Sequence, residues 1–222
     1  MRWGPRELDI DILLYEGTVL DTDELTLPHP GVFDRPYLQR ELGEVAPALM
    51  ADAVILVAHD PRWSEQFAAE AARLRQRLGE VALRVDHVGS TSVPGLTAKA
   101  IVDIQLSVPD VGDARSYVEP LEQLGYDHVP DPRFPTYPFF RYPASGPRAF
   151  HLHVAQAGGV EERDHLEFRD RLRADPEIAS RYAELKRELA RRFFADRVAY
   201  SNSKGDFVQS VLAFEDPQDA GQ

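Results

Sequence analysis

The chain has 222 residues and a formal net charge of −12, half of which lies in the first fifty residues, with 10 acidic and 4 basic side chains. An apolar share of 43% with 28% charged residues excludes a fibrous or wholly disordered protein. Cysteine is absent, which excludes a disulfide scaffold and a thiolate metal site and favours a cytoplasmic location. No apolar run is long enough for a membrane span. The acidic charge disfavours binding to a nucleic-acid duplex.

A change in composition near residue 50 predicts two parts, residues 1–50 and 51–222. In the first part, Asp9 and Asp11 lie two apart in a strand-like stretch, so both carboxylates are expected on one side. Such a pair suits magnesium bound together with phosphate oxygens, whereas a solvated edge strand is the alternative for the two aspartates alone.

The string from Arg2 to Tyr15 closely resembles the signature of 6-hydroxymethyl-dihydropterin pyrophosphokinase, which moves a diphosphate from ATP to a pterin in folate biosynthesis. The resemblance extends to about residue 47. It implies that Asp9 and Asp11 hold two magnesium ions. It also implies that Arg6 belongs to a mobile catalytic loop.

Further along this part, the resemblance assigns His29 and Arg35 to the ATP phosphates. Tyr37, where the family usually has Phe, is assigned to the pterin. Only the last third of that enzyme is covered, and a ferredoxin-like remnant of about fifty residues buries little surface. We therefore expect the segment to be a relic, or to act with the missing N-terminal part of such an enzyme, as a partner or in a longer fusion.

The second part alternates strand and helix patterns, which predicts an α/β or α+β domain with helices flanking a mixed sheet. Apolar spacing and turn residues predict these elements in chain order: strand 54–57, helix 63–78, strand 81–88, strand 100–108, helix 114–124 kinked at Pro120, a hairpin of strands 137–142 and 148–155, helix 166–172, and a helix that begins at Pro176.

A strand that ends in Gly89 and Ser90 offers backbone N–H groups and hydroxyls to phosphate oxygens, and Thr91 and Ser92 continue the hydroxyl-rich turn. Asp103 follows on the next strand, where one carboxylate can carry the metal that phosphates bring. A plain turn is the alternative for the Gly-Ser pair alone. Together the two features predict a nucleotide and metal site.

His151 and His153 alternate with apolar residues, so both face one side of their strand. They are candidate metal ligands beside Asp103, and imidazole would favour zinc or manganese over magnesium. Two histidines hydrogen-bonded within the sheet are the competing interpretation. Gln105 shares the strand face of Asp103 but offers a neutral amide and no second carboxylate, so one metal, a recruited ligand or binding without turnover all stay open.

The second part resembles the GrpB family of the polymerase-beta-like nucleotidyltransferase superfamily over about residues 54–212. The resemblance is carried by the His87–Leu96 string, Lys99, the Ile101–Ile104 strand, the Phe150–Val154 strand, His165 with Phe168, and Tyr200 with Lys204. It implies a site for ATP or another nucleoside triphosphate with magnesium or manganese. Lys99 and Lys204 are the cations expected near the triphosphate.

Three functions follow as hypotheses. The leading one is a metal-dependent nucleotidyl or phosphoryl transferase of GrpB type, with Asp103 and Ser90 at its centre and a small-molecule acceptor. The second is pterin diphosphokinase activity based on Arg6, Asp9 and Asp11. The third is a non-catalytic module that senses a nucleotide, which the neutral Gln105 suggests.

Overall fold

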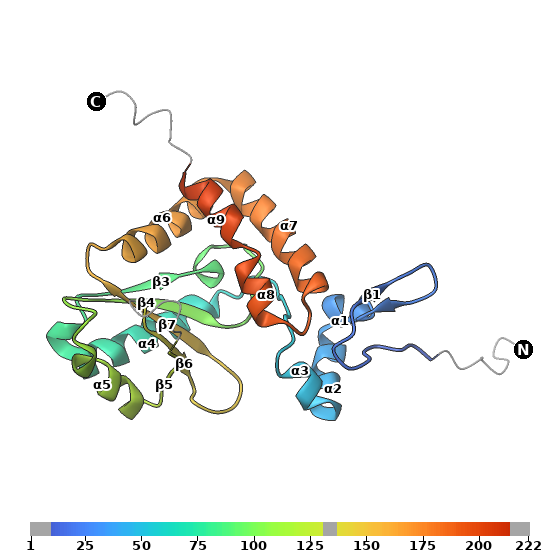
Figure 1. Cartoon of the computed structure of the whole chain (residues 1–222), viewed down its shortest axis with the longest axis horizontal. Coiled ribbons are helices and arrows are strands. Elements are labelled where there is room, and N and C mark those ends of the chain that lie inside the picture. The colour runs from blue at the N-terminus through green and yellow to red at the C-terminus, as the bar shows by residue number, and fades with distance from the viewer. Residues whose placement is uncertain (1–9, 131–136, 214–222) are drawn as a thin grey trace, which may run out of the picture. The chain divides into compact units, whose positions relative to one another are not determined.

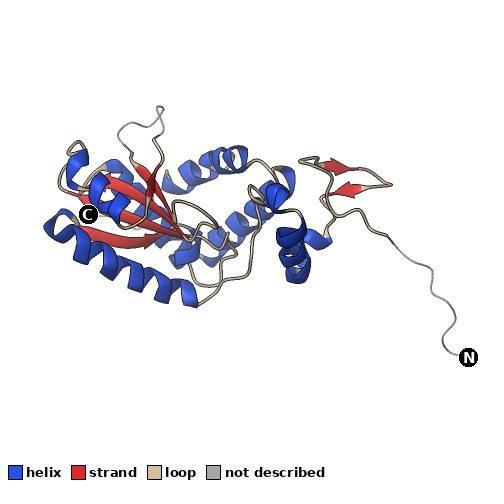
Figure 2. Cartoon of the chain, turned by 90° about the horizontal axis from the view of Figure 1, so that it is seen from below, coloured by secondary structure: helices blue, strands red, loops and turns tan. Residues whose placement is uncertain are grey.

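A computed structural model describes residues 10–130 and 137–213. The candidates Arg6 and Asp9 lie outside these described residues. Helices and a twisted sheet make up the larger part of the fold (Figures 1 and 2). Among the described residues, no helix combines the length and the apolar character that a membrane crossing requires.

The chain divides into two compact units that are not contiguous in sequence. The first unit combines residues 1–55 with 185–204, and the second combines residues 56–184 with 205–222. Helix α7 (Pro176–Arg192) therefore contributes its first half to the second unit and its second half to the first.

The first unit consists of short elements around a small apolar core. Its elements besides the end of α7 are β1 (Leu20–Asp21), β2 (Thr26–Leu27), α1 (Gly31–Asp34), α2 (Pro36–Val45), α3 (Pro47–Met50) and α8 (Arg197–Asn202). Val32, Leu42, Ala53 and Phe194 form the buried core. The Val54 amide donates to the Phe194 carbonyl oxygen at 2.7 Å, which ties the two sequence segments of this unit together.

Two strand predictions are wrong in detail. The described residues from 10 to 19 form no strand, so Asp11 lies in an irregular, exposed stretch rather than on a strand face. The stretch 54–57 makes only an isolated bridge, between Val57 and Ala98. Apolar runs of this length cannot by themselves show whether a partner strand is in reach.

A five-stranded mixed sheet organises the second unit, in the order β3-β4-β7-β6-β5. Its strands are β3 (Arg84–Val88), β4 (Val102–Val108), β5 (Asp127–His128), β6 (Phe139–Tyr142) and β7 (Phe150–Gln156). β4 and β7 pair in parallel, and the other neighbours are antiparallel. The predicted hairpin of β6 and β7 is confirmed, as is the class of a mixed sheet flanked by helices.

Helices cover both faces of this sheet (Figures 1 and 2). α4 and α5 lie on one face, and α6 lies on the other beside α9. The helical elements are α4 (Arg62–Leu78), η1 (Gly79–Val81), η2 (Ser90–Ser92), η3 (Ala114–Ser116), α5 (Val118–Gln123), α6 (Val160–Ala174), the first half of α7, and α9 (Gly205–Leu212).

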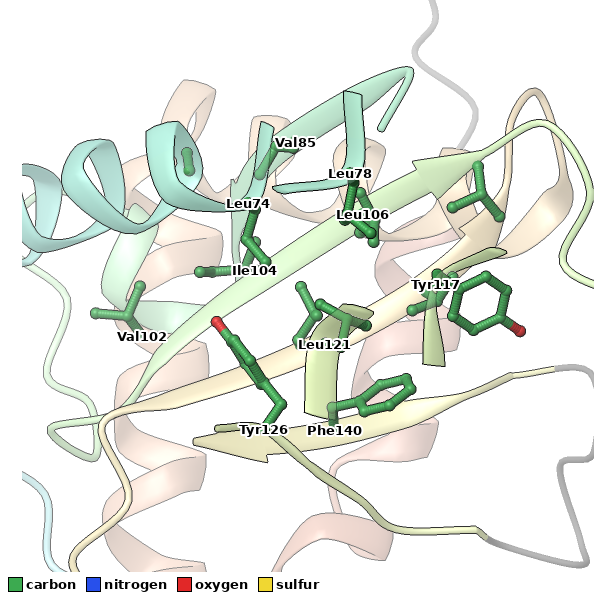
Figure 3. Close-up of a cluster of buried hydrophobic side chains, with 14 of the residues drawn as sticks. Leu74, Leu78, Val85, Val102, Ile104, Leu106, Tyr117, Leu121, Tyr126 and Phe140 are labelled. Atoms are coloured by element: carbon green, nitrogen blue, oxygen red, sulfur yellow. The ribbon is translucent and has the colours of Figure 1, made fainter. Parts of the chain in front are cut away.

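The apolar core lies between the sheet and helices α4 and α5 (Figure 3). Leu74 of α4, Ile104 of β4, Leu121 of α5 and Phe140 of β6 have no exposed surface. Burying one such side chain stabilises the folded state by about 1.5–3 kcal/mol. This core holds β4 in place, because Ile104, the residue after Asp103 on that strand, is buried in it.

The helix predicted over 63–78 is confirmed, and it ends at Gly79 with a φ of 56°. The kinked helix over 114–124 is wrong in one respect, since a short 3-10 turn precedes α5 and Pro120 sits in the first turn of α5. A first-turn residue has no intrahelical hydrogen bond to lose, so the proline causes no kink. The strand predicted from residue 81 starts at Arg84, after η1.

Candidate functional site

A cavity of about 620 Å³ opens beside the sheet on the face that α6 covers. Its walls come from the second unit, at the end of β3, near the start of β4, in the middle of β7 and on helices α6, α7 and α9. The residues that line it are Val88, Gly89, Asp103, Tyr137, His153, Val160, Glu161, Asp164, His165, Phe168, Tyr182, Val208, Gln209 and Leu212. Its volume suits a small-molecule or nucleotide ligand.

Gly89 and Asp103 meet at one wall of this cavity. Val88 pairs with Asp103 across the antiparallel β3–β4 ladder, so the turn after β3 begins beside the carboxylate. Gly89 has a φ of 67°, and a Cβ atom at this position would lie 2.4 Å from Asp103 Oδ2. Only glycine lets the backbone approach the carboxylate so closely.

The hydroxyl groups of the turn are largely engaged within the protein. Thr91 Oγ1 lies 3.0 Å from His87 Nε2, and both residues are buried. Ser92 Oγ donates to the Gly89 carbonyl oxygen at 2.6 Å. Ser90 interacts with the buried Tyr182. Of the four predicted turn residues, Gly89 is the one that lines the cavity.

Two arginines of α6 support the turn from its outer side. Arg169 Nη1 donates to the His87 carbonyl oxygen at 3.2 Å, and Arg173 Nη2 donates to the Ser92 carbonyl oxygen at 2.8 Å. Both guanidinium groups therefore hold backbone carbonyls in place. Burial lowers the pKa of His87 to about 4, so this ring is neutral at neutral pH.

His151 and His153 of β7 flank Asp103 as the sequence predicts. Asp103 is directly opposite His151 in the parallel β4–β7 register. His151 Nδ1 lies 3.3 Å from Asp103 Oδ1, and His153 Nε2 lies 3.7 Å from the same oxygen. Burial alone would raise the pKa of Asp103, but the hydrogen bond with His151, the largest of the opposing interactions, helps to bring it well below its usual range. Asp103 is therefore an anion in the cavity wall.

A hydrogen-bonded chain continues from His153 into the interior. Tyr137 Oη lies 2.9 Å from His153 Nδ1 and 2.8 Å from His165 Nε2. His165 Nδ1 lies 2.6 Å from Gln105 Oε1, and Gln105 is fully buried under α6. Burial lowers the pKa of His165 to about 3 and raises that of Tyr137, so both groups are neutral.

The sequence interpretation missed the roles of Tyr137 and His165 in this site. Tyr137 precedes β6 and His165 lies on α6, and neither spacing nor periodicity connects them with Asp103. His165 was one of the residues that carried the family resemblance, and a third histidine in the helix after the His151–His153 strand was the available signal.

The described side chains around the cavity do not form a centre for a resident metal ion. Within the described parts of the chain, no group of three or more His, Asp or Glu residues is placed to hold one. Asp103, His151 and His153 converge, but their contacts join them to one another and to Tyr137. His151 Nε2 is buried without a hydrogen-bond partner. Metal binding by this trio stays a prediction of the sequence.

The cavity walls are acidic. Asp103, Glu161 and Asp164 contribute carboxyl groups, and none of the described lining residues is Lys or Arg. A free triphosphate would be repelled here, whereas a nucleotide that arrives with a divalent cation brings its own neutralising charge.

The two predicted lysines do not line the cavity. Lys99 is half-buried in the loop before β4, and its positive charge contributes to lowering the pKa of His151, after the larger effect of burial. Lys204 belongs to the first unit, with Nζ 4.5 Å from the centre of the Tyr200 ring. Their contact with a triphosphate stays a prediction.

Four predicted residues of the first unit are described. His29 is half-buried, and its Nδ1 accepts a hydrogen bond from the Gly31 amide at 3.0 Å, at the start of α1. Asp11 and Arg35 are exposed, and Tyr37 is 47% exposed.

Comparison with protein families identifies two regions. The family model described as GrpB protein matches residues 53–213. The model for 7,8-dihydro-6-hydroxymethylpterin-pyrophosphokinase matches residues 1–47. Both matches coincide with the regions that the sequence motifs indicated.

Individual relatives share the second region. A UPF0157 protein of Halalkalibacterium halodurans is 40% identical over 72% of this chain and 81% of its own length. A UPF0157 protein of Pseudomonas aeruginosa is 40% identical over 72% of this chain and 67% of its own length. The crystal structure of the conserved protein GrpB from Enterococcus faecalis is similar, with a TM-score of 0.63, 34% identity, and coverage of 71% of this chain and 94% of that one.

Proposed function

The chain belongs to the GrpB family, and from that premise we propose that its second unit binds a nucleoside triphosphate with a divalent cation and transfers a nucleotidyl group to a small-molecule hydroxyl. The cation enters as part of the nucleotide substrate. The phosphates lie against the turn at Gly89, and Asp103 faces the cation.

One observation carries this proposal: Gly89 and Asp103 stand against each other in the wall of a ligand-sized cavity. The glycine lets the turn approach the Asp103 carboxylate, and the hydrogen bond with His151 keeps that carboxylate ionised. Acidic walls disfavour the free triphosphate and favour its complex with a cation.

The test is a titration of ATP, GTP, CTP and UTP, each with magnesium or manganese, against the wild type and Asp103→Asn. We expect at least one nucleotide to bind the wild type and the variant to lose tenfold or more in affinity. Asp113→Asn is the matched control, because Asp113 is exposed and does not line the cavity. Equal affinity of wild type and Asp103→Asn would refute the site, and so would binding of no nucleotide.

The match of residues 1–47 supports a second candidate, the transfer of diphosphate from ATP to 6-hydroxymethyl-dihydropterin. Release of AMP by the full chain, alone or with the N-terminal part of such an enzyme, tests it. Loss of that release in Asp11→Asn would support the candidate. Absence of release under both conditions would count against it.

A non-catalytic sensing role is the third possibility, because Gln105 replaces an acidic ligand. Nucleotide affinity without turnover against a broad panel of acceptors would favour this role. Transfer of a labelled nucleotidyl group to any acceptor would exclude it.

A further inference from the structure

We propose that His153 is held with its Nε2 lone pair toward Asp103, where it takes the proton of the acceptor hydroxyl group. The ring is held by a hydrogen-bonded chain of three positioning residues, Gln105, His165 and Tyr137. This inference deepens the proposed transferase function and rests on it for the identity of the proton donor. The orientation of the ring stands on the structure alone.

The direction of the chain is set at its buried end. Gln105 Nε2 lies 3.4 Å from the Glu162 carbonyl oxygen, which can only accept a hydrogen bond. The amide therefore turns its oxygen toward His165, and that oxygen can only accept. His165 Nδ1, 2.6 Å away, must carry the proton of this neutral ring.

Each later link has only one direction left. His165 Nε2 has no proton, so it accepts from the Tyr137 hydroxyl at 2.8 Å. With its proton given to His165, the Tyr137 oxygen accepts from His153 Nδ1 at 2.9 Å. A neutral His153 then carries its proton on Nδ1, and Nε2 is left with a lone pair.

This lone pair faces a carboxylate. His153 Nε2 and Asp103 Oδ1 are 3.7 Å apart, which is longer than a hydrogen bond and suits two acceptors that face each other. Asp103 Oδ1 receives instead the Nδ1 proton of His151, at 3.3 Å. A hydroxyl group in the cavity can donate its single proton to His153 Nε2.

In the transfer step, the acceptor hydroxyl gives its proton to His153 Nε2 while its oxygen forms a bond to the α-phosphorus. The bond from that phosphorus to the bridging oxygen breaks, and pyrophosphate leaves with the electron pair. Asp103 stabilises the positive charge that develops on the His153 ring. Gln105 thereby has a role of its own, because an acidic residue at this position, being an acceptor only, would remove the link to Glu162.

The test reads the position of the ring protons by nitrogen-15 NMR of histidine side chains in the full chain without ligand, at a pH where the rings are neutral. We expect both His153 and His165 to carry their protons on Nδ1. A wild-type His153 protonated on Nε2 would overturn the inference, and this measurement needs no variant except those used for assignment.

Tyr137→Phe removes one hydroxyl and keeps the ring. We expect the proton of His153 to shift to Nε2, which then donates a hydrogen bond to Asp103. His165 is expected to keep its proton on Nδ1, which still donates to the Gln105 side-chain oxygen. Tyr117→Phe is the matched control, because its buried hydroxyl bonds to a carbonyl outside the cavity. An unchanged His153 in Tyr137→Phe would overturn the inference. The NMR measurement tests the orientation of the His153 ring without any nucleotide. The nucleotide titration tests the proposed function, so a failure of one can be told from a failure of the other.

Discussion

Gly89 is the single residue on which the geometry of the cavity wall depends most. In Gly89→Ala, the added methyl group would lie 2.4 Å from Asp103 Oδ2, so either the turn or the carboxylate has to move. The backbone of Gly89, with a φ of 67° and a ψ of −172°, is also one that essentially only glycine adopts, and it costs an alanine about 1–3 kcal/mol. We expect a loss of stability well beyond that amount, together with loss of nucleotide binding.

Gly95→Ala is a matched control for this substitution. Gly95 has a similar φ of 78°, but a Cβ atom there would meet nothing within 4 Å. Chemical denaturation of both variants separates the backbone cost from the collision with Asp103. Equal losses of unfolding free energy in the two variants would contradict the described contact.

Because of His87, the free energy of unfolding is expected to fall at acid pH. Its ring is stacked on Phe67 at 4.8 Å, and burial lowers its pKa from 6.5 to about 4. Between those values the unfolded chain binds the proton and the folded chain does not, so stability falls as the pH drops from about 6.5 to about 4. The loss amounts to roughly 3 kcal/mol at most.

The variant His87→Gln isolates this effect, since Gln does not titrate but can still bond to Thr91. We expect the unfolding free energy of the variant to change less than that of the wild type between pH 7 and pH 4. Urea denaturation across this range is the measurement. Parallel pH profiles would show that His87 does not titrate in the range that its burial implies.

At the scale of elements, helix α4 anchors the sheet through its buried stripe. Leu74 has no exposed surface and packs against the same core as Ile104 of β4. Leu74→Ala is expected to cost about 2–5 kcal/mol of unfolding free energy. Leu83→Ala, at a site that is 53% exposed, is expected to cost well under 1 kcal/mol. A similar cost at both sites, measured by denaturation, would contradict this packing.

Elements with local signals could be predicted from the sequence. The helix from Arg62 has an amphipathic stripe and a glycine end, and the β6–β7 hairpin has a turn between alternating segments. The faces of β4 could not be predicted fully. Its polar face, with Gln105, is buried because α6 covers it, and strand periodicity does not reveal what packs on a polar face.

The candidate site shows the same limit. Gly89, Asp103, His151 and His153 come together because the ends of neighbouring strands place them there, which a sequence pattern can indicate. Tyr137 joins them only through the tertiary fold. Hydroxyl groups of the turn at Thr91 and Ser92 were expected to face phosphate, and the structure engages them in internal hydrogen bonds.

At the scale of the whole molecule, two family matches share one chain, and the compact units do not follow their boundary. The GrpB match begins at residue 53, yet residues 185–204 group with the first unit. The core around Phe194 and Val32 explains this grouping, because it joins the two segments. A composition change along the sequence marks a boundary but cannot reveal such a return of the chain.

A nucleotide with its cation is proposed to occupy the cavity beside Gly89 and Asp103. A crystal structure of the full chain, with magnesium and a non-hydrolysable form of the nucleotide that binds most tightly, tests it most directly. We expect phosphate density against the Gly89 turn, with the cation between the phosphates and Asp103. Phosphates bound elsewhere on the chain, with this cavity filled only by water, would contradict it.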